Sequence, residues 1–320
     1  MNDTGNDTET LVPQSAIEGP ALAFDFPGVE IGVAEYPRGP TGATVIRFAK
    51  RASLEIDRRG GGVIMVGDYG TTDAICLAGG SVLGLEASMG VAQALHIAQG
   101  RTTGFDELAL VSGAIIYDFG YRRNAIYPDK ALGTAAFAAA RPGWFPQGAR
   151  GAGMSATVGN AAPLTPYGWE TSGQGAAFRQ YGETKVLAIS VVNALGGIFD
   201  RDGKLVRGFL HGETGERHPL HELMVERLEH EGVEVANTTL TVIVTNQKLD
   251  HFTQGQIARQ VHVAMGRMIR PFHTIYDGDV LFMVSTEEVD NPRIGPITLG
   301  EFAADTLWDA VLAAIPPDHS

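Results

Sequence analysis

Residues 237–245 read Asn-Thr-Thr-Leu-Thr-Val-Ile-Val-Thr, and this stretch decides how the chain is interpreted. Apolar and threonine residues alternate in it and most are β-branched, which predicts a buried β-strand. A threonine at the mouth of such a strand suits an internal cut, because Thr238 Oγ could attack the carbonyl of Asn237. The cut would leave Thr238 with a free α-amine beside its hydroxyl, a nucleophile and a base in one residue. On these residues alone, the commoner explanation is a strand start chosen for β-propensity.

Composition excludes several functional classes. The chain has 320 residues, 44% of them hydrophobic, and a mean hydropathy of +0.01, which suits a globular protein of one large domain or two. Its net charge of −13 argues against a nucleic-acid partner. The single cysteine, Cys76, excludes an intrachain disulfide. No apolar run is long enough to cross a membrane and residues 1–20 lack a signal-peptide pattern, so we expect a cytoplasmic protein with no membrane partner.

Hydrophobic periodicity predicts the elements of the remaining chain. Residues 81–99 carry apolar side chains every three to four positions after Gly79-Gly80, which predicts a helix entered through a backbone turn. The predicted helices are 81–99, 129–140, 220–231, 252–268 and 303–315. The predicted strands are 41–48, 62–66, 108–116, 186–193, the strand after Thr238 and 279–284. Clusters of strands and helices in this order predict an α+β fold with helices packed on two sheets.

Two segments lack such a period. Residues 1–20 are polar and acidic, and we expect a disordered tail there. Residues 141–182 are rich in glycine, proline and aromatic residues. We expect them to form a long loop region that carries part of a site.

Four polar side chains near predicted strand ends could complete a site around Thr238. Asn193 ends an apolar strand, and its amide could donate to a developing oxyanion; it could equally be a turn residue. Asp277 and Asp279 flank Gly278, and two carboxylates there could hold an α-amine; alone, the pair is also a common turn or a weak calcium loop. The phenol of Tyr117 could reach into the site, or make a structural hydrogen bond.

Many blocks of the chain occur in an order that resembles the DmpA-like peptidase family of N-terminal nucleophile hydrolases, and within it the endo-type 6-aminohexanoate-oligomer (nylon) hydrolases. The resemblance covers residues from about 24 to about 313. The blocks include Phe24-Asp25-Phe26-Pro27-Gly28-Val29, Ala74-Ile75-Cys76-Leu77-Ala78-Gly79-Gly80, Ile116-Tyr117-Asp118-Phe119, Tyr127-Pro128-Asp129-Lys130, Gly151-Ala152-Gly153-Met154-Ser155, the Asn237-Thr238-Thr239 site, Pro271-Phe272-His273-Thr274 and Asp277-Gly278-Asp279.

The resemblance implies an αββα sandwich in which residues 21–320 form a single catalytic domain. It implies autocleavage between Asn237 and Thr238 into an α chain, 1–237, and a β chain, 238–320. It assigns catalytic roles to Thr238, Asn193, Asp277, Asp279 and Tyr117, with no cofactor and no metal. It further implies an oligomeric amide substrate and a homo-oligomer of αβ units, a tetramer.

One position departs from the family. Nylon hydrolases carry a lysine in the loop after Gly-Ala-Gly-Met-Ser, and Asn160 stands at the matching position here. The loop that follows, residues 161–171, looks longer. Asn160 can still donate a hydrogen bond, and Lys130 or Arg150 could substitute for the missing ammonium.

Other activities stay open. An aminopeptidase releasing small or β-amino residues is the nearest rival, with Asp277, Asp279 or Glu170 able to bind a substrate amine. Acyl transfer and an uncleaved, inactive binding or scaffold protein are further alternatives. The chain has no G-x-S-x-G elbow, and its histidines lack the H-E-x-x-H spacing of a zinc site.

Overall fold

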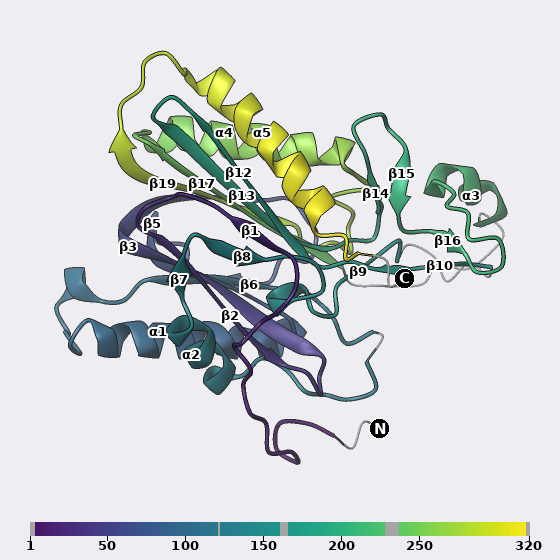
Figure 1. Cartoon of the computed structure of the whole chain (residues 1–320), viewed down its shortest axis with the longest axis horizontal. Coiled ribbons are helices and arrows are strands. Elements are labelled where there is room, and N and C mark those ends of the chain that lie inside the picture. The colour runs from purple at the N-terminus through teal and green to yellow at the C-terminus, as the bar shows by residue number, and fades with distance from the viewer. Residues whose placement is uncertain (1–3, 121, 161–165, 228–236, 318–320) are drawn as a thin grey trace.

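The long strand β3 (Thr41–Arg58) organises the fold (Figure 1). Its first half pairs with β2 (Val29–Tyr36) and β5 (Thr71–Ala78). After an irregularity between Arg47 and Ala52, its second half pairs with β19 (Val280–Val289). β3 therefore belongs to two sheet layers and joins them. The computed structural model describes residues 4–120, 122–160, 166–227 and 237–317.

The two layers are the two halves of one continuous hydrogen-bonded sheet, stacked against each other. The first layer contains β2, β3, β5 and β6 (Val111–Ile115), with β4 (Met65–Val66) and β7 (Arg141–Pro142) at its edges. The second contains β12 (Gln174–Tyr181), β13 (Thr184–Asn193), β17 (Thr238–Gln247) and β19. In the described part of the chain, β17 with β19 and β5 with β6 are the parallel pairs.

Helices cover the outer face of each layer, as Figure 1 shows. Helices α1 (Leu85–Ala98) and α2 (Lys130–Ala138) pack on the first layer through one apolar cluster. Helices α4 (His251–Ala264) and α5 (Pro296–Ala313) pack on the second through another. A third cluster, which includes Leu240, Val242 and Val244, fills the space between the layers. The arrangement confirms the expected αββα sandwich.

Short elements extend the sandwich at one end, near the carboxyl end of β13. They are β9 (Thr157–Val158) with β11 (Glu170–Thr171), β10 (Tyr167–Gly168) with β16 (Leu210–His211), β14 (Gly197–Phe199) with β15 (Leu205–Arg207) and β18 (Ile269–Arg270), and α3 (Leu220–Arg227). The pair β1 (Ala21–Ala23) with β8 (Trp144–Pro146) lies apart from this end, where β8 contacts β12 of the second layer and β2 of the first. Of the helix predicted over 220–231, residues 228–231 lie outside the described residues.

The segment expected as a disordered tail is held against the domain where it is described. Within residues 4–20, the Asn6 side chain exchanges two hydrogen bonds of 3.0 Å with the backbone of Tyr127. Gln14 pairs with the backbone of Glu35. The expectation was wrong because backbone pairing and amide hydrogen bonds anchor this segment, and Leu11 and Ile17 pack against the apolar clusters of the domain.

The loop region expected over 141–182 also contains a full strand, β12. Its Gln-Gly-Ala-Ala start carries little β-propensity. Small residues are needed there because a Cβ at Gly175 would lie 2.1 Å from the carbonyl oxygen of Ala310 in α5. Close packing of a helix thus hid a strand from sequence reasoning.

In the part of the chain that the structure describes, every helix is too short or too polar to span a lipid bilayer.

Candidate active site

The strand ladder places Thr238 between two specific neighbours. In the antiparallel pair β13–β17, Thr238 lies opposite Asn193. In the parallel pair β17–β19, Leu240 lies opposite Val280 and a bridge joins Asn237 to Asp277, so Thr238 lies at the level of Gly278. Strand register therefore brings together Asn193, Thr238 and the segment Asp277-Gly278-Asp279. Along the chain, 86 positions separate Asn193 from Asp279.

The peptide bond between Asn237 and Thr238 is held in a polar, buried setting. Thr238 Oγ1 donates a hydrogen bond of 2.6 Å to the Asn237 carbonyl oxygen. The backbone N–H of Gly278 donates to the same oxygen over 2.7 Å. Negative charge that developed on this oxygen would be stabilised by the Gly278 N–H, which is the arrangement of an oxyanion hole.

Gly278 is required by this contact. A Cβ at this position would lie 2.5 Å from Thr238 Oγ1 and 3.1 Å from the Gly62 carbonyl oxygen. The adjacent Gly60 and Gly61 are equally constrained, since a Cβ on either would lie within 2.5 Å of the backbone of residues 275–279. Sequence reasoning missed these glycines as site residues, although the triplet Gly60-Gly61-Gly62 was a signal of close backbone approach.

Asp279 is fully buried and both of its carboxylate oxygens are engaged. Oδ1 accepts a 2.8 Å hydrogen bond from the Thr239 N–H. Oδ2 accepts from the backbone N–H of His273 over 3.1 Å and lies 3.1 Å from His273 Nδ1. This carboxylate therefore fixes the backbone next to Thr238.

Asp277 is buried with one oxygen still available. Its Oδ2 accepts from the Thr274 N–H over 2.9 Å, whereas Oδ1 has no hydrogen-bond partner within the described residues. Burial, together with the nearby charge of Asp279, raises the pKa of Asp277 to about 6. A cation placed beside Oδ1 would find an acceptor there.

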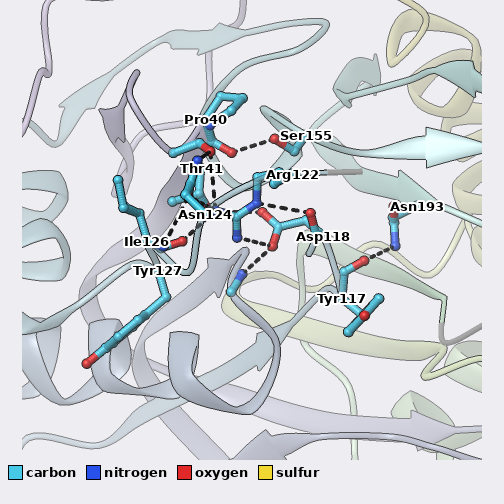
Figure 2. A network of polar contacts seen from close by, with 12 residues as sticks. Pro40, Thr41, Tyr117, Asp118, Arg122, Asn124, Ile126, Tyr127, Ser155 and Asn193 are labelled. Atoms are coloured by element: carbon cyan, nitrogen blue, oxygen red, sulfur yellow. Dashed lines mark hydrogen bonds and ion pairs between the residues drawn. The ribbon is translucent and has the colours of Figure 1, made fainter. Parts of the chain in front are cut away.

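Asn193 contributes its side-chain amide to the same region, as Figure 2 shows. Its Nδ2 donates to the Tyr117 carbonyl oxygen over 2.9 Å, and its Oδ1 accepts from the Thr157 N–H over 3.0 Å. One Nδ2 hydrogen is left for a further acceptor. Tyr117 contacts Asn193 through its backbone, and its ring lies edge-on against Phe119 at 6.2 Å.

A buried ion pair supports the Tyr117 loop (Figure 2). The Asp118 carboxylate accepts from Arg122 over 2.7 Å, from the Thr41 hydroxyl over 2.9 Å and from the Gly80 N–H over 2.8 Å. The side chains of Asp118 and Arg122 are 1% and 2% exposed. Because this pair is fully hydrogen-bonded, it fixes the carbonyl to which Asn193 donates.

The structure brings Asn160 to the site but leaves Lys130 apart from it. Asn160 is buried, and its Nδ2 lies 2.6 Å from Asn237 Oδ1 and 3.2 Å from the Ala194 carbonyl oxygen. Lys130 is an exposed residue at the start of α2 in the outer helical layer, where its carbonyl packs on Gly90. In the loop that was expected to be longer, residues 161–165 lie outside the described residues.

Glu170 is occupied by arginines. Its carboxylate accepts hydrogen bonds from Arg217 over 2.6 and 2.8 Å, lies 3.3 Å from Arg207 and accepts from the Gly208 N–H. Burial opposes its ionisation, but these hydrogen bonds and cations outweigh burial and lower the pKa of Glu170. It therefore serves the local structure of β11, and it is a poor candidate for binding a substrate amine.

Side chains of the types that bind metal ions occur throughout the described residues. Across the described ranges, no group of three His, Cys, Asp or Glu side chains is arranged to hold an ion. Two of the histidines, His211 and His218, instead lie edge-on to the ring of Tyr167, with ring centroids at 5.0 and 5.3 Å.

Comparison with known proteins shows the family of the chain. The family model described as peptidase family S58 matches residues 23–316. The chain belongs to peptidase family S58. It is therefore a hydrolase of amide bonds. The polar residues around Asn237 and Thr238 are candidates for its active site.

Individual relatives and solved structures extend the comparison. A 6-aminohexanoate-oligomer endohydrolase of Paenarthrobacter ureafaciens is 47% identical over 97% of this chain and 90% of its own length. Among solved structures, the L-aminopeptidase D-Ala-esterase/amidase of Ochrobactrum anthropi, described as a variant of the Ntn hydrolase fold, superposes with a TM-score of 0.66 at 15% identity, covering 94% of this chain and 88% of its own. A β-aminopeptidase of Burkholderia gives 0.65 at 18% identity, over 92% and 88%. These two structures show a shared fold.

Proposed function

We propose that this S58 protein splits itself between Asn237 and Thr238 and then hydrolyses 6-aminohexanoate oligomers at internal amide bonds, with Thr238 as its N-terminal nucleophile. The observation that carries the proposal is the Asn237 carbonyl, whose oxygen accepts hydrogen bonds from both Thr238 Oγ1 and the Gly278 N–H. The substrate class is suggested by the name of the relative that is 47% identical over nearly the whole chain.

Autocleavage would proceed as an acyl shift followed by hydrolysis. Thr238 Oγ attacks the Asn237 carbonyl carbon, the carbon–nitrogen bond breaks, and the hydroxyl proton ends on the departing nitrogen. This shift frees the α-amine of Thr238. Water then hydrolyses the ester, which leaves Asn237 with a carboxylate and restores the Thr238 hydroxyl. Gly278 N–H stabilises the oxyanion in the first step.

Substrate turnover would use the same atoms. The α-amine, whose pKa is ordinarily about 7.7–8.0, takes the proton of Thr238 Oγ as the hydroxyl attacks the substrate amide. That proton passes to the leaving amine, and water activated by the α-amine releases the acyl group. Asp277 Oδ1, which has no hydrogen-bond partner within the described residues, would accept a hydrogen bond from the α-ammonium, and the remaining Nδ2 hydrogen of Asn193 would donate to the substrate oxyanion.

The primary test is the mass of the purified protein. We expect two chains, with the smaller beginning Thr-Thr-Leu-Thr-Val, and a single intact chain for Thr238→Ala. An intact wild-type chain after prolonged incubation, or a different N-terminus, would disprove the proposal. Products from a long linear 6-aminohexanoate oligomer then separate the modes of cleavage: internal fragments support endo-hydrolysis, single residues indicate an aminopeptidase, and products with an added acyl acceptor indicate acyl transfer.

The two fragments should stay together after cleavage. The fragment from Thr238 onward supplies β17, β19, α4 and α5, and β17 lies between β13 of the other fragment and β19. All ten residues of β17 are buried, so separation would expose a large apolar surface. Size-exclusion chromatography without denaturant should elute both fragments in one peak, as a homo-oligomer of αβ units, and two separate peaks would contradict the expectation.

A further inference from the structure

Two histidines, the buried His262 and the half-buried His273, lie beside Asp279 on the helix-covered side of the second layer. His262, in the last turn of α4, is fully buried, and its ring centroid is 4.4 Å from that of His273 with the rings almost perpendicular. Each histidine is tied to a carboxylate through Nδ1: His262 to Asp57 at 3.0 Å and His273 to Asp279 at 3.1 Å. Because a carboxylate only accepts, both Nδ1 atoms carry a proton.

The hydrogen-bonded pair of His262 and Asp57 is held in place by further contacts. Asp57 lies on β3 and also accepts from Arg59 Nε over 2.7 Å. Burial alone would raise the pKa of Asp57, but the hydrogen bonds from His262 and Arg59 lower it to about 2. Burial lowers the pKa of His262, so its ring is a neutral donor to Asp57 near pH 7. His273 therefore packs against a ring that is itself held in place.

His273 adopts a backbone conformation that its residue type does not favour. Its φ is +60°, in the left-handed region where non-glycine residues are uncommon. Such a conformation persists where surrounding contacts over-determine it, commonly at functional sites. Here those contacts are the two hydrogen bonds, from its backbone N–H and its Nδ1, to the same oxygen of Asp279.

We propose that His273 is a positioning residue for the Thr238 reaction. Its Nδ1–H holds Asp279 so that Oδ1 binds the Thr239 N–H, and this fixes Thr238 Oγ1 beside the Asn237 carbonyl. The inference rests on the proposed function and assigns a role to a residue outside the reacting atoms.

Three substitutions at His273 separate the hydrogen bond from the backbone conformation. Glycine, asparagine and aspartate all tolerate a positive φ. Only His273→Asn places an N–H donor near the position of Nδ1. His273→Asp has the same shape without the donor, and His273→Gly removes the side chain. The readout is the rate at which newly translated precursor splits, followed by intact mass, with unfolding temperatures compared in the uncleavable Thr238→Ala background.

We expect His273→Gly and His273→Asp to split on the order of 10–100-fold more slowly than wild type, since hydrogen bonds to charged groups have effects of that size. We expect His273→Asn to split within several-fold of wild type. Equal rates in the Asn and Asp variants, whether both fast or both slow, would overturn the inference, and this matched pair decides even if the Gly variant fails to fold. A wild-type chain that never splits would instead refute the proposed function.

Discussion

At the scale of single residues, the side-chain amide of Asn193 is held in one orientation by hydrogen bonds within the protein, without any substrate. Its side chain is 1% exposed, with Oδ1 bound to the Thr157 N–H and Nδ2 to the Tyr117 carbonyl. The amide is thereby oriented with one N–H left over. Preorganised donors of this kind need no rearrangement as charge develops, which is why they lower reaction barriers.

Asn193→Ala should therefore have two separable effects. Loss of one oxyanion donor should lower turnover of a 6-aminohexanoate oligomer by about 10²–10³-fold. Leaving the Thr157 N–H without its acceptor should cost about 1–3 kcal/mol of unfolding free energy. Turnover is measured on fully split protein, and stability is measured by urea unfolding in the Thr238→Ala background. Wild-type turnover in this variant would remove Asn193 from the site.

At the scale of elements, the site depends on the register of three strands. Asp277, Gly278 and Asp279 precede β19, and Asn237 to Thr239 occupy the corresponding levels of β17. A shift of one position would replace Gly278 by an aspartate at the level of Thr238, where even a Cβ would lie 2.5 Å from the hydroxyl. The site therefore requires the register that places Gly278 at the level of Thr238.

Gly278→Ala tests this requirement. The added methyl group should displace Thr238 Oγ1 from the Asn237 carbonyl and slow precursor splitting on the order of 100-fold, the usual effect of a misplacement near 1 Å. The control is Gly266→Ala, since a Cβ at Gly266 has no neighbour within 4 Å and its φ is not positive. Comparable splitting in both variants, followed by intact mass, would show that the close approach is unimportant.

At the scale of the whole molecule, the buried carboxylate pair links the site to folding stability. The folded-state pKa of Asp277, about 6, lies above the ordinary value of 3.8 because of burial and of Asp279. Between those two values the folded state binds more protons than the unfolded state, so stability falls as pH rises through about 4 to 6. The uncleaved precursor therefore carries an unfavourable charge at neutral pH.

The contribution of Asp277 can be separated from that of other groups with its neutral isostere, asparagine. In the Thr238→Ala background, the unfolding free energy should fall more between pH 4 and pH 7 with Asp277 than with Asp277→Asn, by up to about 3 kcal/mol. His262, whose pKa burial lowers, contributes a slope of opposite sign in both proteins and cancels in the comparison. Identical pH dependence in the two proteins, measured by urea unfolding, would show that Asp277 does not titrate in this range.

The sequence by itself determined the local features of this protein. Alternation of Leu240, Val242 and Val244 predicted β17, periodic apolar residues predicted the helices on both outer faces, and the layered class followed from their order. Asp277 and Asp279 were recognisable as candidate site residues because chain proximity places them together. These features depend on neighbours within a few positions, and a single sequence records such neighbours directly.

Only the tertiary structure decided how the candidate site is completed. The glycine opposite Thr238, the backbone partners of Asn193, the histidine pair behind Asp279 and the hidden strand β12 all depend on contacts between distant segments. His262 and Asp57, for example, are 205 positions apart and meet because α4 packs across β3 and β19. Strand register and close packing fix such contacts in three dimensions, and no pattern of neighbouring residues encodes them.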